Sequence, residues 1–294
     1  FQTPKEAISR HSSKMHLVPP SGKPLKFDFD GYVLNRVAHD ENLVELAKKS
    51  GADYLIDSMV EKVEENRVLL KNGDSYSAKV IVDAGGHNGP LRRDYWNEKS
   101  VKIPVKFVLM DGDFGEAVEL HFGSMAPGGY AWMFPKSKGA NIGLGIQRSF
   151  AKGRNLNQYT DDFVSKYDGE ISFTGAGSLP MSGTLKKFVK GNYMLVGDSA
   201  GMVLPSNGAG ITIAMIGGRI AGQVISEHLS SGIPLEEYEK RWKKQMGKVM
   251  RNSKRSFKMG SMLFRLPDWI LNLLFNRLTK NIIWRAVTCR RMLW

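Results

Sequence analysis

The residues best suited to chemistry lie where an apolar strand ends and a glycine-rich loop opens a helix. In chain order, this motif comprises the strand Tyr193–Val196, Gly197, Asp198, Gly208, Gly210 and Ile211. The start of a helix offers unpaired N–H groups and a positive dipole end, which suit an anion or an electron-rich ring edge. Asp198 could accept hydrogen bonds from ligand hydroxyls, or it could simply cap the helix. Because α/β folds bind ligands where strand ends meet helix starts, ligand binding is the favoured interpretation.

A second group of chemically distinctive residues is aromatic. Tyr130, Trp132 and Phe134 alternate along the chain, and Gly143 and Gly145 follow them. Alternate residues of a strand share one face, so the three rings are expected side by side. Aromatic side chains dominate protein cores, so ordinary core packing is one interpretation. The lining of an apolar ligand cavity is the other.

Mixed secondary structure is predicted around these motifs. Helices are expected over residues 39–49, 155–167 and 208–229, and again after Pro234 and Pro267. Asn72-Gly73 predicts a hairpin with positive φ at both turn positions. Strands are expected at Tyr32–Leu34, Tyr54–Ile56, Arg67–Leu70, Tyr76–Val82, Val101–Met110, Ala117–Phe122, Tyr130–Phe134, Asn141–Gln147 and Tyr193–Val196.

The charge of the chain is concentrated at its C-terminal end. The 294 residues carry a formal net charge of +13, and the segment from Glu239 onward holds 15 basic residues against two acids. The rest of the chain is therefore neutral, which argues against a uniformly basic nucleic-acid-binding protein. With Cys289 as the single cysteine, an internal disulfide or a cysteine-cluster metal site is excluded. No histidine–carboxylate spacing suggests a metal site.

Several blocks resemble the geranylgeranyl reductase family of FAD-dependent oxidoreductases. The Gly-Asp motif is similar to the second flavin motif of enzymes related to aromatic hydroxylases. Pro127-Gly-Gly-Tyr-Ala-Trp-Met-Phe-Pro135 with Gly143-Leu-Gly145 resembles the Tyr-x-Trp-x-Phe-Pro…Gly-x-Gly signature of the reductases. Tyr32–Arg36 with Asp40, and Val80–Gly85, are also similar, and the matches run in the family's order.

The resemblance implies an α/β (mixed α+β) fold. It consists of an FAD-binding Rossmann-like domain of the aromatic-hydroxylase type, an antiparallel-sheet substrate domain and a helical C-terminal tail. The first βαβ unit, with its Gly-x-Gly-x-x-Gly turn, is expected upstream of Phe1. The expected ranges are the remainder of the FAD domain at 1–96, the substrate domain at 97–185, the FAD-domain return at 186–232 and the basic helical region at 233–294.

The resemblance also assigns cofactor residues. Asp198 would bind the ribityl or phosphate part of FAD, and Gly210 and Ile211 would offer backbone N–H groups to the flavin pyrimidine edge. Arg36 matches a position that contacts FAD, although an ordinary ion-pair arginine is the alternative. Val60, Gly197 and Gly208 complete the expected cofactor site. The family's Ala-Asp-Gly reads Asp83-Ala84-Gly85 here, and the shifted acid points to the other strand face, which puts a cofactor role for it in doubt.

The implied reaction transfers hydride from reduced flavin to a C=C bond of an isoprenoid chain. Tyr130, Trp132 and Phe134 would then line the substrate cavity. Tyr130 is a weak candidate for the proton donor, whereas His87 and His121 are more typical of structural histidines. An archaeal-type digeranylgeranylglycerophospholipid is the first choice of substrate, ahead of a menaquinone side chain or a prenyl diphosphate. The alternatives are an FAD-dependent monooxygenase or halogenase of the same fold, and a non-catalytic lipid-surface-binding fragment.

The basic tail has three interpretations: a solvated face, an anionic lipid surface and nucleic acid. Nine basic residues between Lys240 and Lys258 could hold the protein against anionic lipid. Trp242, Trp269, Trp284 and Trp294 suit a membrane interface, and no nucleic-acid-binding motif is recognisable. We therefore expect a cytoplasmic protein, peripheral at the inner face of the membrane, with no nucleic-acid partner. Its electron donor would be ferredoxin or NAD(P)H.

Overall fold

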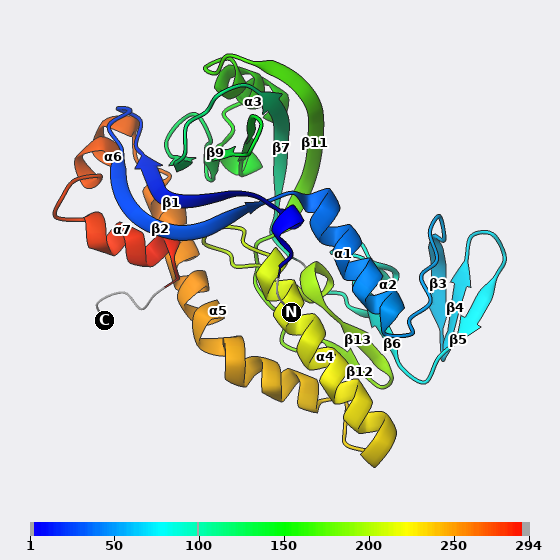
Figure 1. Cartoon of the computed structure of the whole chain (residues 1–294). Coiled ribbons are helices and arrows are strands. Elements are labelled where there is room, and N and C mark those ends of the chain that lie inside the picture. The colour runs from blue at the N-terminus through cyan, green and yellow to red at the C-terminus, as the bar shows by residue number, and fades with distance from the viewer. Residues whose placement is uncertain (1–2, 99, 290–294) are drawn as a thin grey trace. The chain divides into compact units, whose positions relative to one another are not determined.

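The computed structural model describes residues 3–98 and 100–289, which form two compact units (Figure 1). Unit 1 comprises Phe1–Leu55, Ile103–Ser178 and Ser261–Asn281. Unit 2 comprises Ile56–Lys102, Leu179–Gly260 and Ile282–Trp294. The chain thus enters each unit three times.

Unit 1 is built on a seven-stranded sheet with the order β11-β7-β10-β9-β8-β1-β2. Antiparallel pairing joins β7, β10, β9 and β8 in turn and also joins β1 to β2, while β1 runs parallel to β8. The strands are β1 (Ile8–Val18), β2 (Leu25–Leu34), β7 (Lys102–Asp111), β8 (Val118–His121), β9 (Tyr130–Pro135), β10 (Ala140–Gly145) and β11 (Glu170–Pro180).

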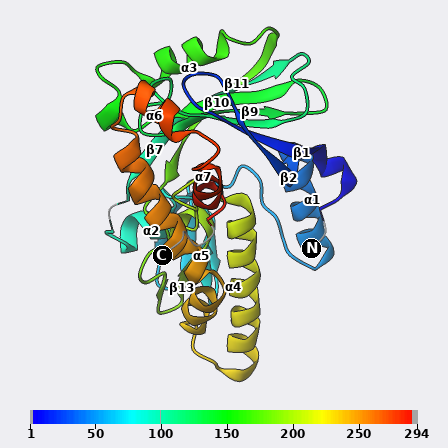
Figure 2. The ribbon, with the colours of Figure 1, turned by 90° about the vertical axis from the view of Figure 1, so that its left-hand side faces the viewer.

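Helix α3 (Leu156–Val164) packs on one face of this sheet (Figure 2). A reciprocal capping box between Asn155 and Gln158 fixes its start. Tyr159 and Phe163 of the helix join the apolar side chains of β9 and β10 in one buried cluster. The other helical elements of unit 1 are η1 (Lys5–Ala7), α1 (Arg36–Lys49), η2 (Arg148–Phe150) and α6 (Asp268–Leu274).

Helix α6 is tied to loops of unit 1. The carboxylate of Asp268 accepts hydrogen bonds from the Ser124 backbone N–H and hydroxyl, at 3.0 and 2.6 Å. The Asn272 side chain accepts one from Ser21 N at 2.8 Å. The range 233–294, expected as one basic helical region, is therefore shared between the two units.

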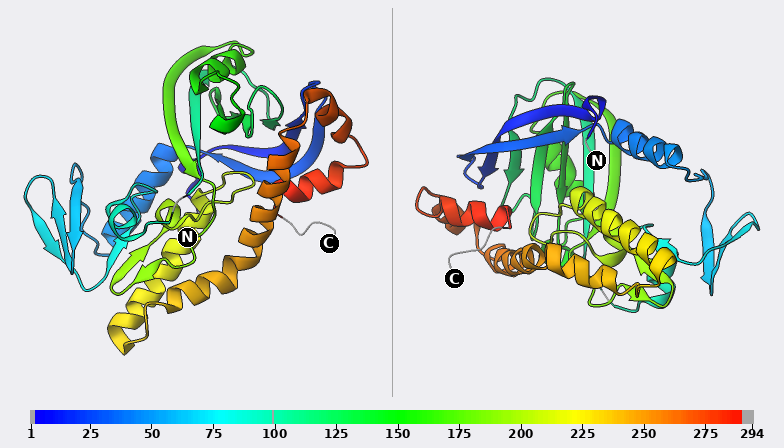
Figure 3. Two further views of the ribbon diagram at one scale, coloured as in Figure 1. Left: turned by 180° about the vertical axis from the view of Figure 1, so that it is seen from behind. Right: turned by 60° about the horizontal axis from the view of Figure 1, so that its bottom comes forward.

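Unit 2 contains two three-stranded sheets. In one, β6 and β13 are parallel and β12 is antiparallel to β13; in the other, β3, β4 and β5 are antiparallel neighbours (Figure 3). The strands are β3 (Val60–Glu64), β4 (Arg67–Leu70), β5 (Ser75–Ser77), β6 (Ile81–Asp83), β12 (Val189–Lys190) and β13 (Tyr193–Leu195). The helices are α2 (Pro90–Tyr95), η3 (Gly197–Ala200), α4 (Ile211–Ser231), α5 (Glu237–Leu263) and α7 (Lys280–Val287).

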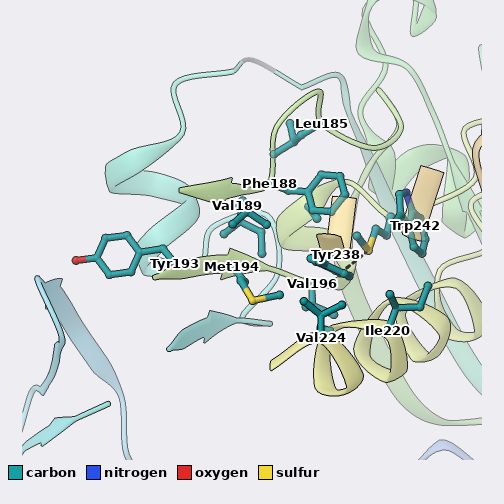
Figure 4. Close-up of a cluster of buried hydrophobic side chains, with 14 of the residues drawn as sticks. Leu185, Phe188, Val189, Tyr193, Met194, Val196, Ile220, Val224, Tyr238 and Trp242 are labelled. Atoms are coloured by element: carbon teal, nitrogen blue, oxygen red, sulfur yellow. Dashed lines mark hydrogen bonds between the residues drawn. The ribbon is translucent and has the colours of Figure 1, made fainter. Parts of the chain in front are cut away.

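The core of unit 2 lies between β13 and helices α4 and α5 (Figure 4). Tyr238 and Trp242 of α5 pack there with Ile220 and Val224 of α4, and all four are almost fully buried. The buried carboxylate of Glu239 accepts the N–H groups of Phe188 and Val189 at 2.7 and 3.1 Å. This pair of charge-assisted hydrogen bonds anchors α5 to the start of β12.

Most expected elements are confirmed, including the mixed α/β class with a large antiparallel component and a helical C-terminal region. The strand expected at Tyr54–Ile56 is wrong, because the chain is irregular there. The strand expected over Tyr76–Val82 is two strands, β5 and β6, which belong to different sheets. Strands β1, β3, β11 and β12 were not expected.

The β4–β5 hairpin is confirmed, but its turn differs from the expected one. Only Gly73 has positive φ, at 95°. Asn72 instead accepts the Asp74 N–H on its side-chain oxygen at 3.1 Å, forming an Asx turn. The side chain of Asn72 therefore closes the turn without a left-handed backbone at that position.

No helix in the described part of the chain is both long enough and apolar enough to span a bilayer. The buried thiol of Cys289 has no cysteine partner in the sequence.

Candidate functional site

The Gly-Asp motif has the strand–loop–helix geometry that its sequence predicts. Strand β13 ends at Leu195, Asp198 lies in the 3₁₀ turn η3, and Gly210 is the N-cap of α4. Gly208 adopts φ of 70°, a left-handed conformation that glycine adopts without strain. Because Gly208 and Gly210 carry no side chain, the loop leaves the backbone accessible at the start of a 21-residue helix.

Asp198 lies next to that helix start. A Cβ on Gly210 would stand 3.5 Å from the Asp198 Oδ1 atom. Gly197, with φ of 65°, lies equally close to the first turn, since a Cβ there would stand 3.3 Å from the Ala214 Cβ. The structure thus brings together five of the predicted cofactor residues: Gly197, Asp198, Gly208, Gly210 and Ile211.

The Asp198 carboxylate keeps its hydrogen-bonding capacity for a ligand. Burial raises its pKa above the ordinary value, and the charge of His87 partly offsets that rise. Burial also lowers the pKa of His87. No hydrogen bond to the Asp198 side chain is found within residues 3–98 and 100–289. Because an acceptor without donors is costly when dehydrated, this carboxylate is suited to ligand hydroxyls.

Asp83 has a different role in the same unit. Its Oδ1 atom accepts hydrogen bonds from Gly85 N and the Ser199 hydroxyl at 2.8 and 2.9 Å, and its Oδ2 atom accepts one from Arg92 N at 3.0 Å. The Asp83 side chain is buried and joins β6 to the turn that carries Asp198. The sequence left a cofactor role for Asp83 in doubt, and it did not predict this positioning role. The signal was a serine directly after Asp198.

These residues fit the flavin that the resemblance implies. The first N–H groups of α4 have no partner within the helix, and Gly210 at the N-cap supplies no competing side-chain acceptor. An electron-rich ring edge can therefore accept hydrogen bonds there, while Asp198 accepts them from hydroxyls. Ile211 begins the helix and is 39% exposed, which leaves its surface accessible to a ring.

The other two predicted cofactor residues occupy different surroundings. Arg36, in unit 1, is exposed and forms an ion pair with Asp40, with Nη2–Oδ2 and Nε–Oδ1 distances of 2.8 and 3.3 Å. Val60, in unit 2, begins β3 and packs against the buried cluster of that unit. Arg36 thus forms the ion pair that the alternative interpretation of this residue expects.

The aromatic block forms a continuous half-buried face on β9. The Tyr130 and Trp132 ring centroids are 6.0 Å apart, and Trp132 and Phe134 stack at the same distance with 25° between their planes. The buried side chains of this strand, Ala131 and Met133, point to the other face. Of the two interpretations of the rings, this pattern favours a ligand surface over ordinary core packing, because the residues between the rings are the ones that the core buries.

Glycines of β10 make room for these rings. Gly143 pairs with Trp132 and Gly145 with Tyr130. A Cβ on Gly143 would lie 2.6 Å from the Trp132 Cζ2 atom and 2.6 Å from the Lys106 backbone oxygen. The Trp132 indole N–H donates to Asn141 Oδ1 at 2.7 Å, which fixes the ring over the glycine strand. The result is an aromatic surface in which Trp132 and Phe134 are stacked and the Tyr130 ring is inclined at 60° to Trp132, and such an apolar surface suits an apolar chain.

Tyr130, the weak candidate for the proton donor, and His121, expected to be structural, differ in their surroundings. Burial raises the pKa of Tyr130 to about 12, so its hydroxyl stays protonated at neutral pH. His121 lies on the other sheet face, where its Nε2 atom is 2.9 Å from Glu119 Oε2 and 3.3 Å from the Tyr167 hydroxyl. The His121 hydrogen bond lowers the pKa of Glu119. His121 thus belongs to a polar network beneath α3, away from the aromatic rings.

Within the described ranges, no group of three or more His, Cys, Asp or Glu side chains has a geometry that could hold a metal ion.

Comparison with known proteins bears on both motifs. Residues 101–176, which include the aromatic block and both glycines, match the family model for the geranylgeranyl reductase catalytic domain. The digeranylgeranylglycerophospholipid reductase of Methanococcus vannielii is 32% identical, over 94% of this chain and 77% of the relative. A geranylgeranyl bacteriochlorophyll reductase-like structure from Thermoplasma acidophilum superposes with a TM-score of 0.84 at 25% identity, covering 97% of this chain and 81% of that one.

More distant structures share the fold alone. A flavin-dependent brominase superposes with a TM-score of 0.70 at 16% identity, covering 96% of this chain and 78% of its own. The expected flavoprotein fold is therefore confirmed.

Proposed function

The chain belongs to the geranylgeranyl reductase family, and we propose that it reduces C=C bonds in the geranylgeranyl chains of a digeranylgeranylglycerophospholipid, with FAD as its cofactor. The observation that carries this proposal is the aromatic face of β9 opposite the glycines of β10. It lies within the segment that matches the reductase catalytic domain. A surface of three rings without charged side chains suits an isoprenoid chain.

The Gly-Asp motif would hold the cofactor. When bound, FAD supplies the hydride that one carbon of the double bond receives. The N–H groups at the start of α4 stabilise negative charge at the ring edge that they face, because the helix dipole is positive there. Asp198 accepts hydrogen bonds from cofactor hydroxyls, and the hydrogen bond from Ser199 to Asp83 holds its turn in place.

The aromatic face would bind the substrate chain and exclude water from it. Trp132, fixed by Asn141, offers a flat surface, and Gly143 keeps the neighbouring strand from obstructing it. We assign the proton of the second carbon to Tyr130, the only one of the three rings of this face that carries a hydroxyl. A Tyr130→Phe variant should bind FAD and substrate normally and reduce double bonds at least tenfold more slowly.

The reaction can be tested by incubating the protein with FAD, a reductant and digeranylgeranylglyceryl phosphate without oxygen. Each reduced double bond adds two hydrogen atoms, which mass spectrometry detects. Parallel reactions with reduced ferredoxin and with NAD(P)H identify the electron donor. Unchanged lipid in all of them, or hydroxylated or halogenated product that forms only with oxygen, overturns the reductase assignment.

We further propose that α5 holds the protein at the inner face of an anionic membrane. Tyr238, Trp242, Met246 and Met250 line its buried face. Its basic side chains lie on the outer face, and each contributes on the order of 1 kcal/mol near anionic lipid. These exposed residues are Lys240, Lys243, Lys244, Lys248, Arg251, Lys254, Arg255 and Lys258.

Vesicle sedimentation tests this membrane proposal. Binding should require phosphatidylglycerol and should fall at least tenfold when Lys244, Lys248 and Arg255 are changed to Gln. Changing Lys71, Lys79 and Lys186 to Gln removes the same charge from exposed positions outside α5 and should leave binding within twofold. Equal binding to phosphatidylcholine vesicles contradicts the proposal.

A further inference from the structure

A cavity of about 170 Å³ lies in unit 2 between α5 and the segment that precedes β12. Three cationic side chains of α5 line it: Lys243, Arg251 and Lys254. Lys243 forms an ion pair with Glu239 at 3.6 Å. Arg251 and Lys254 make no ion pair with any described acidic side chain. Two positive charges at this cavity therefore lack a counterion within the described chain.

The inner wall of the cavity is apolar, with one polar group. Phe188, Trp242 and Met250 contribute buried apolar surface. Thr184 also lines the cavity, and its buried hydroxyl oxygen has no hydrogen-bond partner among the described residues. A buried hydroxyl without a partner is costly, and an acceptor brought by a ligand would relieve that cost.

Two glycines keep the cavity open. Gly247 lies in the interior of α5, where glycine is a poorer helix former than alanine. A Cβ at Gly247 would stand 3.5 Å from the Arg251 Nη1 atom, so any longer side chain would enter the cavity. Gly183, with φ of 72°, lies beneath Lys254, because a Cβ there would be 2.3 Å from the Lys254 Cε atom. Both glycines allow the cationic side chains to lie close to the backbone.

We propose that this cavity binds the phosphate head of an amphiphile, with the first carbons of its apolar chain on Trp242 and Met250. Arg251 and Lys254 supply charge-assisted donors to the phosphate oxygens, and the Thr184 hydroxyl donates to one of them. The volume is below the roughly 300–1,000 Å³ of sites that enclose whole small molecules. The site therefore holds a head group and leaves the rest of a chain outside.

Calorimetry with soluble probes at constant ionic strength tests the site. Hexyl phosphate represents the lipid-like ligand, inorganic phosphate the free ion, and hexanol the apolar chain alone. We expect saturable binding of hexyl phosphate, at least tenfold tighter than binding of either other probe. Arg251→Gln with Lys254→Gln should weaken it at least tenfold.

A matched pair of substitutions separates the site from the general charge of α5. Lys248→Gln with Arg255→Gln removes the same charge from the same helix at residues that do not line the cavity, and should change the affinity by no more than twofold. Gly247→Leu should fill the cavity and weaken binding at least tenfold. Because leucine favours helix over glycine, that variant should remain folded, which circular dichroism checks.

Three results would overturn the proposal: no saturable binding of hexyl phosphate, equal losses in the two charge-matched pairs, or equal affinity for hexyl phosphate and inorganic phosphate. All three measurements are made without FAD or a double bond to reduce. Failure of the reductase assignment therefore leaves this test intact, and failure here leaves the reductase assignment intact.

Discussion

The two faces of strands β9 and β10 differ in how completely their side chains are packed. On one face, Ala131, Met133, Ile142 and Leu144 are buried under α3. On the other, the largest side chains of the strand pair are only half-buried, and they stand opposite glycines. Aromatic rings normally provide much of a protein core. Because the rings of β9 lie on the face that is only half-buried, their surface is available to a ligand.

Unit 2 shows the same contrast with polar groups. Asp83 accepts three hydrogen bonds from the chain itself. The carboxylate of Asp198, in η3 next to the start of α4, accepts none from the residues that the structure describes. Groups whose partners are all internal hold the fold together. Groups that keep unused capacity are the candidates for binding. Four substitutions, two from each class, can test this contrast.

Ile142→Ala should have the largest effect on stability. The Ile142 side chain is fully buried on the core face, and truncating such a residue costs about 2–5 kcal/mol in transfer free energy and cavity formation. Urea unfolding measures this cost. A loss below about 1 kcal/mol would show that this face is not the packed one.

Asp83→Asn should cost slightly less, about 2–4 kcal/mol, because hydrogen bonds to charged groups are strong and the new amide would face an N–H donor. Thermal unfolding checks the change. Ser199→Ala removes only one of the three bonds and serves as the control, with an expected loss of about 1 kcal/mol. If Asp83→Asn and Ser199→Ala lost equal stability, the two backbone hydrogen bonds of Asp83 would contribute nothing, which would contradict its positioning role.

Trp132→Ala should affect stability less and activity more. The ring is half-buried, so its removal should cost only about 1 kcal/mol of unfolding free energy. The rate of double-bond reduction should fall at least tenfold, because the substrate chain loses its flat support. Urea unfolding and product mass spectrometry separate the two effects. A loss of stability as large as that of Ile142→Ala would break the contrast between the faces.

Asp198→Asn should have the smallest effect on stability, within about 0.5 kcal/mol at pH 4. Burial raises the Asp198 pKa in the folded state, so the folded chain binds this proton more tightly than the unfolded chain. The stability contribution of the protonated carboxyl is therefore lost as pH rises from the unfolded pKa of about 4 through the raised folded value. The variant lacks that slope and should be at least as stable as the parent at pH 7.

The same Asp198→Asn variant should bind FAD about tenfold more weakly, because an amide accepts hydrogen bonds less strongly than a carboxylate. Fluorescence titration with FAD measures the affinity. A variant that loses stability at pH 7 and keeps its FAD affinity would place Asp198 with the internally satisfied groups.

Local motifs were predictable from the sequence where all the residues that define the motif lie in one short segment. The turn into α4 follows from Gly208, whose positive φ glycine adopts without strain, and Gly210 adds an N-cap without a side chain. The alternation of Tyr130, Trp132 and Phe134 predicted a shared strand face, which is confirmed. Long-range pairings were not predictable, because β1 and β11 form through partners distant in the chain and the stretch Tyr76–Val82 divides between two sheets.

The sequence by itself determined the family, the strand–loop–helix around Asp198 and the set of rings on β9, because these depend on local residue types and spacing. Only the tertiary structure decided which face those rings occupy, since alternation identifies two faces but not which one the core covers. It also decided that Asp83 supports the turn of Asp198, and that Arg251 and Lys254 line a cavity while neighbouring cations do not. Those distinctions depend on contacts between segments far apart in the chain, which residue spacing alone does not encode.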